Sequence, residues 1–89
     1  MKDLFLDPSY EKDSKRLKKR HYDLSKIEAP VEFLLKGETL PAKYKDHALT
    51  GNLQGKRELH IESNWLLMYK SSDTEIILIR TGSHDDFYK

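Results

Sequence analysis

The chain has 89 residues, with 16 basic and 15 acidic side chains, 4 histidines and a formal net charge of +1. A chain of this length forms one domain with a modest core, so we treat residues 1–89 as a single unit. It has no cysteine, which excludes a disulfide framework, a thiolate metal site and a cysteine nucleophile. No apolar run approaches the roughly 20 residues that cross a bilayer, and the amino terminus has no signal-like stretch. We therefore expect a cytoplasmic protein with no membrane contact.

The small net charge hides an uneven distribution. Residues 11–26 contain seven basic and three acidic side chains, a local charge of +4, so the rest of the chain carries −3. Such asymmetry indicates a polyanion or an acidic protein as partner. A solvated helix face would give the same pattern, and the sequence does not choose between the two.

The amino-terminal third predicts one strand and two helices. Residues 2–6 read as a short strand, and a helix follows over residues 8–20, with Asp7 as N-cap and a proline at its first position. A second apolar stripe with helical spacing runs over residues 23–36. Pro30 falls inside it, so this helix is either kinked there or starts afresh at that residue.

The rest of the chain predicts a long loop and three strands. Periodicity lapses over residues 39–55, which predicts a long loop or a partly ordered excursion. Strand patterns follow at residues 57–62, 65–70 and 75–80, with a tail too short to fold alone. The order β-α-α-β-β-β predicts an α+β fold: a small, antiparallel-rich, four-stranded sheet with two helices packed on one face. The opposite face of the sheet is then free to carry a site.

Strand alternation gives the sharpest inference about chemistry. Leu59 and Ile61 point towards the core, so Glu58 and His60 stand on the open face, separated by about 6.6 to 7 Å along the strand. That spacing could bracket a phosphate or a sugar between two proton-transfer groups. Alternation also puts Arg57 on the face opposite Glu58, unless the strand bulges.

Two further histidines could join this pair, His47 from the preceding loop and His84 from just after the last strand. A single histidine in a small domain is more often structural, and only convergence favours a catalytic role. The neighbouring side chains suit a ribonucleic acid, because cations neutralise phosphates and aromatic rings stack on bases. The candidate binding residues are Lys45, Lys56, Arg57, Asn64, Trp65 and Arg80, although Trp65 could equally be a core residue of a buried strand.

Five short motifs then occur in order: D-H at residues 46–47, L-x-G at 49–51, G-K-R-E-L-H at 55–60, W-L-L-M-Y at 65–69 and R-T-G-S-H at 80–84. In combination they resemble the YafQ branch of the RelE/ParE toxin superfamily, over nearly the whole chain. The element order predicted above is also that of the RelE-like fold.

The resemblance implies an mRNA interferase, the toxin of a type II toxin–antitoxin system, which cuts mRNA in the ribosomal A site. It implies a cognate antitoxin, DNA-binding and RelB/DinJ-like, whose complex with the toxin binds operator DNA. It also implies the catalytic set His47, Glu58, His60, His84 and Tyr88. Asn64 departs from the pattern, because relatives carry Asp before the Trp; an amide can hydrogen-bond a sugar or phosphate but cannot titrate.

The mechanism expected from these residues is transesterification by the ribose 2′-hydroxyl, with no metal and no cofactor. His84 is the favoured acid, and Glu58 or His60 is the base. His47, Lys45 and Arg80 bind the phosphates. Two alternatives stay open at this stage. One is a non-enzymatic inhibitor of DNA gyrase, as in the ParE branch; the other is a zinc hydrolase using three histidines and Glu58, although the chain lacks a helical HExxH motif.

Overall fold

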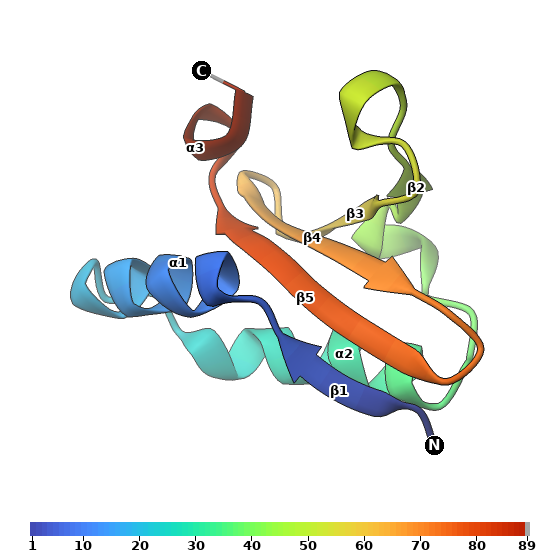
Figure 1. Cartoon of the computed structure of the whole chain (residues 1–89). Helices are drawn as coiled ribbons and strands as arrows, with labels where there is room; N and C mark the ends of the chain where they lie inside the picture. Colours follow the sequence, from blue (N-terminus) through green and yellow to red (C-terminus); the bar gives the residue numbers. More distant parts are fainter. Residues whose placement is uncertain (89) are drawn as a thin grey trace.

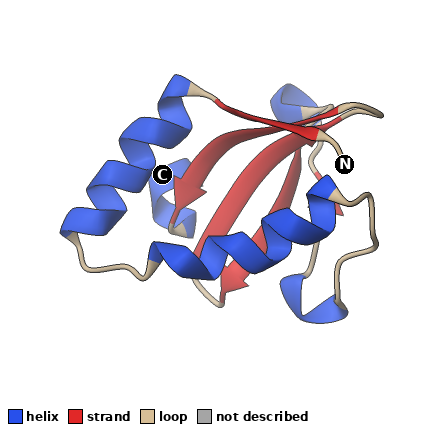
Figure 2. Cartoon of the chain, turned by 90° about the horizontal axis from the view of Figure 1, so that it is seen from below, coloured by secondary structure: helices blue, strands red, loops and turns tan. Residues whose placement is uncertain are grey.

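The computed structural model describes residues 1–88 and shows a sheet covered on one face by two helices (Figures 1 and 2). In chain order the elements are β1 (Asp3–Leu6), α1 (Pro8–Lys19), the 3₁₀ turn η1 (Leu24–Ile27), α2 (Glu28–Leu35), η2 (Ala42–Tyr44), β2 (His47–Ala48), η3 (Gly51–Leu53), β3 (Arg57–Glu62), β4 (Trp65–Ser71), β5 (Glu75–Gly82) and α3 (His84–Tyr88). Among these residues no helix is long and apolar enough to span a bilayer.

The sheet has five strands in the order β1-β5-β4-β3-β2. β1 runs parallel to β5, and every other neighbouring pair is antiparallel. The α+β class and the placing of α1 and α2 on one face are as predicted, but the expected count of four strands and two helices is wrong. The extra elements are β2 and α3, which have two and five residues and are too short to leave a periodic pattern.

Local sequence explains where the first two helices begin. The Asp7 carboxylate accepts a hydrogen bond from the amide of Ser9 at 2.9 Å, and Pro8 occupies the first helical position of α1. The second helical stretch is in two pieces, because the 3₁₀ turn η1 precedes α2. Pro30 is the third residue of α2. The first turn of a helix tolerates proline because amides there have no partner within the helix, so the helix starts two residues before Pro30 and is not broken by it.

The core lies between the helices and the sheet. It includes Leu17 from α1, Val31 and Leu34 from α2, and Leu59 and Leu67 from the central strands, all buried. We call the opposite face of the sheet, away from α1 and α2, the site face. On β4 the alternate residues Leu66 and Met68 point to the site face and are also buried, at 1% and 5% exposed. This second apolar layer forms the floor on which the site is built.

The 39–55 segment is the partly ordered excursion that was one of the two alternatives expected from its sequence. The turn η2 inserts the ring of Tyr44 into the core, and Lys45 takes a left-handed conformation with φ of 50°. The chain then pairs with β3 through β2, and η3 follows. Figure 1 shows the turn after β2 and α3 rising beyond the same end of the sheet.

Candidate active site

Three segments that are distant in sequence line one open depression of about 310 Å³. They are β2 with the turn after it, β3 and α3, and the lining residues are His47, Leu49, Thr50, Leu53, Glu58, His84 and Tyr88. Four of the predicted catalytic side chains therefore meet here. The fifth, His60, lies beside His47, with 6.3 Å between the ring centroids.

The strand register explains why these groups meet. His47 is paired with Glu58 across β2 and β3, and Glu58 with Met68 across β3 and β4. His60 lies two residues along β3 from Glu58 and so shares its face, as the alternation predicts. The structure therefore places His47, Glu58 and His60 together over the floor formed by Leu66 and Met68.

Glu58 is the central buried group of the site, with 5% of its surface exposed. Its Oε1 lies 3.5 Å from Nε2 of His47 on one rim of the depression. Its Oε2 accepts a hydrogen bond of 2.5 Å from the hydroxyl of Tyr88 on the other rim. Burial of Tyr88, with the neighbouring Glu58 carboxylate, raises the pKa of its hydroxyl to about 12, so the phenol keeps its proton at neutral pH.

His47 is held by the backbone that precedes it. Its Nδ1 lies 2.8 Å from the carbonyl oxygen of Lys45, while the ring itself is about half exposed. The next residue back, Asp46, fixes the segment to the sheet: it pairs with the guanidinium of Arg57 and accepts a hydrogen bond from the hydroxyl of Tyr69. The Arg57 and Tyr69 side chains thus anchor the rim that carries His47.

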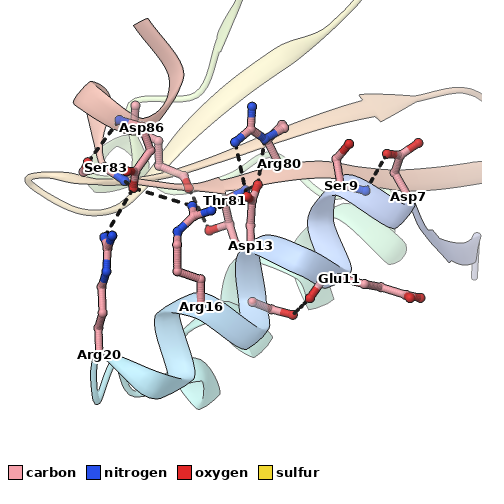
Figure 3. A network of polar contacts seen from close by, with 12 residues as sticks. Asp7, Ser9, Glu11, Asp13, Arg16, Arg20, Arg80, Thr81, Ser83 and Asp86 are labelled. Atoms are coloured by element: carbon pink, nitrogen blue, oxygen red, sulfur yellow. Dashed lines mark hydrogen bonds and ion pairs between the residues drawn. The ribbon is translucent and has the colours of Figure 1, made fainter. Parts of the chain in front are cut away.

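α3 is held in place by the polar network shown in Figure 3. Asp86 accepts a 2.8 Å hydrogen bond from the amide of Ser83 and lies 3.7 Å and 3.9 Å from the guanidinium groups of Arg16 in α1 and Arg20 at its C-cap. That amide bond, with both arginines, lowers the pKa of Asp86. A Cβ on Gly82 would lie 2.6 Å from Oδ2 of Asp86, so this close approach requires glycine. α1 therefore helps to position the helix that carries His84 and Tyr88.

Asn64 supports the same helix from the β3–β4 turn, since its Oδ1 accepts a hydrogen bond of 3.2 Å from the amide of His84. The rings of His84 and Tyr88, one helical turn apart, have centroids 4.8 Å apart. Asn64 thus contacts the backbone of a candidate catalytic residue, and its amide does not need to titrate to do so.

Some of the candidate binding residues make contacts within the fold instead of facing the depression. Arg57 lies on the helix-covered face, as alternation predicts, and is paired with Asp46. Trp65 is 2% exposed, donates to Thr81 and packs edge-on against Tyr22, so its ring is a core residue with no face to offer a base. That corrects the stacking role expected for it.

Arg80 is also largely occupied. Its guanidinium makes hydrogen bonds of 2.7 Å and 3.2 Å to the buried carboxylate of Asp13 and lies over the ring of Phe87, 5.2 Å from its centroid. Lys45 is exposed on the rim beside His47, and Lys56 is partly buried before β3. Of the basic candidates, Lys45 is the one next in sequence to a lining segment and open to solvent.

The sequence analysis did not identify Asp13, Asp46 and Asp86, the three carboxylates whose contacts fix the elements around the site. Asp13 interrupts the apolar stripe of α1 between Tyr10 and Leu17, and a charged residue on a buried stripe is the signal that could have revealed it. Within residues 1–88 no group of three or more His, Cys, Asp or Glu side chains has the spacing of a metal site.

Fold and site together define a small α+β domain that carries histidine and glutamate side chains, suited to acid–base chemistry, on the open face of its sheet. Residues 2–89 match the model of a family described as the YafQ bacterial toxins of type II toxin–antitoxin systems. The chain belongs to the YafQ toxin family, and it is a toxin of this type.

Individual relatives agree with this assignment. The chain is 39% identical over 84 residues, 93% of this chain and 91% of the relative, to the mRNA interferase toxin YafQ of Escherichia coli strain K12. It resembles YafQ in the E. coli DinJ–YafQ toxin–antitoxin complex, with 37% identity, a TM-score of 0.91 and coverage of 99% of this chain and 98% of that one. It also resembles a copper-bound mutant toxin from Helicobacter pylori, with 36% identity, a TM-score of 0.94 and coverage of 99% and 100%.

Proposed function

We propose that this toxin is an mRNA interferase, an endoribonuclease that cuts mRNA in the ribosomal A site by metal-independent transesterification. The observation that carries the proposal is the depression in which His47, Glu58, His84 and Tyr88 meet, with His60 beside it. The relatives named mRNA interferase support the same activity. They favour it over inhibition of DNA gyrase, which would make no use of a set of histidines gathered around one depression.

The reaction needs two proton transfers and a cation. The ribose 2′-oxygen attacks the adjacent phosphorus and gives its proton to a base, either His60 or Glu58. The bond from phosphorus to the 5′-oxygen breaks, and that oxygen takes a proton from an acid, for which His84 is best placed by its exposure on α3. The products are a 2′,3′-cyclic phosphate and a 5′-hydroxyl, so no water and no redox partner is consumed.

The remaining groups have supporting roles. Positive charge on His47 and Lys45 stabilises the phosphoryl oxygens as charge gathers on them. Tyr88 lies between His84 and Glu58, and Asn64 fixes the backbone of His84. Arg80, although it is paired with Asp13, keeps 35% of its side chain exposed, which leaves part of the guanidinium open to a phosphate.

The partners follow from the family. A cognate antitoxin of the RelB/DinJ kind covers the toxin in the cytoplasm, and the complex binds operator DNA through the antitoxin. The DinJ–YafQ complexes of E. coli support this pairing. The exposed lysines of α1, which give residues 11–26 much of their +4 charge, are available to ribosomal RNA or to an acidic antitoxin segment.

The test is cleavage of a defined mRNA on purified translating ribosomes, with the ends of the products mapped chemically. The wild-type protein should leave 2′,3′-cyclic phosphate and 5′-hydroxyl ends at A-site codons, also after exhaustive chelation. His84→Ala should lower the cleavage rate by about 10²- to 10⁴-fold, the usual contribution of one proton transfer. The matched control is His21→Asn, because His21 has φ of 66°, a conformation that Asn tolerates, and lies outside the site. Intact mRNA with the wild-type protein would refute the proposal.

A further inference from the structure

Glu58 and His60 are equal candidates for the base on chemistry alone, but the contacts of Glu58 distinguish them. Both of its carboxylate oxygens are occupied, one by Tyr88 at 2.5 Å and the other by His47 at 3.5 Å. The residue is 5% exposed. A base must come within hydrogen-bonding reach of the proton that it removes. Glu58 is therefore placed to act on its two neighbours, and not on a ribose hydroxyl.

The backbone fixes where one proton of His47 resides. Nδ1 of His47 lies 2.8 Å from the carbonyl oxygen of Lys45. A carbonyl oxygen can only accept a hydrogen bond, so Nδ1 must carry hydrogen and donate it. In a neutral imidazole with hydrogen on Nδ1, the other nitrogen has a lone pair and accepts.

That lone pair would lie close to an oxygen of Glu58, because Nε2 is 3.5 Å from Oε1, within ion-pair distance. Two acceptors at this distance repel each other, which favours a proton on Nε2 or on Glu58. The Tyr88 contact decides which. The hydroxyl of Tyr88 donates to Oε2, so this contact favours a carboxylate that accepts hydrogen bonds and places the shared proton on Nε2 of His47.

We propose that Glu58 is a positioning residue, which holds His47 as an imidazolium ion, and that His60 is the base of the cleavage reaction. In this arrangement His47 is a fixed cation for the phosphoryl oxygens, oriented by the Lys45 carbonyl on one side and by Glu58 on the other. Tyr88 completes this series of contacts by hydrogen-bonding the second oxygen of the Glu58 carboxylate. The assignment of His60 as base rests on the proposed function, whereas the charge on His47 does not.

The surroundings agree with this charge distribution. The ionisable side chains near the pair are His60 from β3, His84 and Tyr88 from α3, and the exposed Lys45 two residues before His47, and none of them is acidic at neutral pH. Glu58 is thus the carboxylate that a cation on His47 pairs with. His60 is partly exposed and makes a ring contact with His47, so it lies next to the phosphate position that this cation defines.

The first experiment reads the imidazole nitrogens of the free ¹⁵N-labelled protein by long-range ¹H–¹⁵N NMR at neutral pH, with His47→Asn to assign the signals. Both His47 nitrogens should show protonated shifts. In Glu58→Gln, His47 should become neutral and keep its hydrogen on Nδ1, where the Lys45 carbonyl remains. A neutral His47 in the wild-type protein, or hydrogen on Nε2 alone, would overturn the proposal, and neither reading depends on ribosomes.

The second experiment compares ribosome-dependent cleavage by the wild type and by Glu58→Gln as a function of pH. If Glu58 positions a cation, the defect of Glu58→Gln should shrink as pH falls, because solvent protons then charge His47 without the carboxylate. Tyr88→Phe should lower the rate by about 10- to 100-fold, as expected for one hydrogen bond to a charged group. His60→Ala should show a defect that lower pH does not repair.

A Glu58→Gln defect that stays constant or grows as pH falls would overturn the positioning role, because charging His47 from solvent would then not replace what the carboxylate supplies. The two experiments also separate this proposal from the proposed function. Absence of cleavage by the wild-type protein would refute the function, and the NMR result on His47 would still stand or fall by itself.

Discussion

The ion pair between α1 and β5 offers the clearest test of how the scaffold is held together. Asp13 is 2% exposed and accepts hydrogen bonds from Arg80 at 2.7 Å and 3.2 Å and from the amide of Thr81 at 3.1 Å (Figure 3). Arg16 adds an ion pair at 3.1 Å. Replacement Asp13→Ala removes the acceptor from all of these donors at once.

The expected cost follows from these contacts. Removing one partner of a buried ion pair costs about 3 to 5 kcal/mol, because the other charge is left without compensation. Arg80 keeps 35% of its side chain exposed and can recover some hydration, so we expect the lower end, about 3 kcal/mol. That is a large share of the roughly 4 to 13 kcal/mol typical of a chain of this length.

The assay is urea unfolding followed by circular dichroism, with Asp73→Ala as the control. Asp73 is an exposed aspartate in the turn between β4 and β5, so its removal should change the free energy of unfolding by less than about 0.5 kcal/mol. For Asp13→Ala the midpoint should fall with an unchanged slope. A loss below about 1 kcal/mol would refute the reasoning, since the buried carboxylate would then be as dispensable as the exposed one.

Three further outcomes are expected. Asp86→Asn should lower ribosome-dependent cleavage about tenfold and the free energy of unfolding by about 1 kcal/mol, because α3 loses its charged contacts to Arg16 and Arg20. Equal cleavage by the variant and the wild type would contradict this. Asp46→Asn should speed hydrogen exchange of the Leu49 amide, which donates to the Lys56 carbonyl, about tenfold as β2 loosens, measured by NMR. The raised pKa of the Tyr88 hydroxyl gives stability that is fully present below about pH 10 and is lost as pH rises through about 12. Tyr88→Phe should remove that part of the alkaline loss of stability, measured as the free energy of unfolding against pH. Identical curves for the variant and the wild type would contradict the assignment.

Strong periodicity made much of the fold predictable. β3 has the bounds expected from its alternation, and α1 ends one residue before the predicted end, because a capped amphipathic helix and a half-buried strand both leave regular patterns. β2 and α3 left none. A two-residue strand is defined by its partner, and a five-residue helix by the caps and charges that hold it, here Ser83 and Asp86.

The candidate site was predictable for the residues that share a strand. Alternation alone places Glu58 and His60 on one face, and it also places Arg57 on the other. His47 and His84 reach the same depression through long-range packing, which no local sequence pattern encodes. The same packing took Trp65 into the core, because its ring lies in the helix–sheet core against Tyr22.

The basic character of residues 11–26 has two components in the structure. Arg16 and Arg20 face Asp86, and Arg16 also pairs with Asp13, so part of the charge stabilises the protein's own fold. Lys12, Lys15, Lys18 and Lys19 are exposed and remain available to a partner. The exposed lysines fit either reading of the charge pattern, a partner surface or a solvated helix face, whereas the arginines paired with Asp86 belong to neither.

The central claim is that β2, β3 and α3 build one reaction site, and a double-mutant cycle tests it most directly. The measurement is the single-turnover rate of mRNA cleavage on ribosomes by His47→Ala, His84→Ala and the double variant. Groups that act in one catalytic unit have strongly non-additive effects, so the double variant should be little slower than the slower single one. Two effects that simply multiply, or a double variant that cleaves at the wild-type rate, would show that the opposite rims of the depression do not work together.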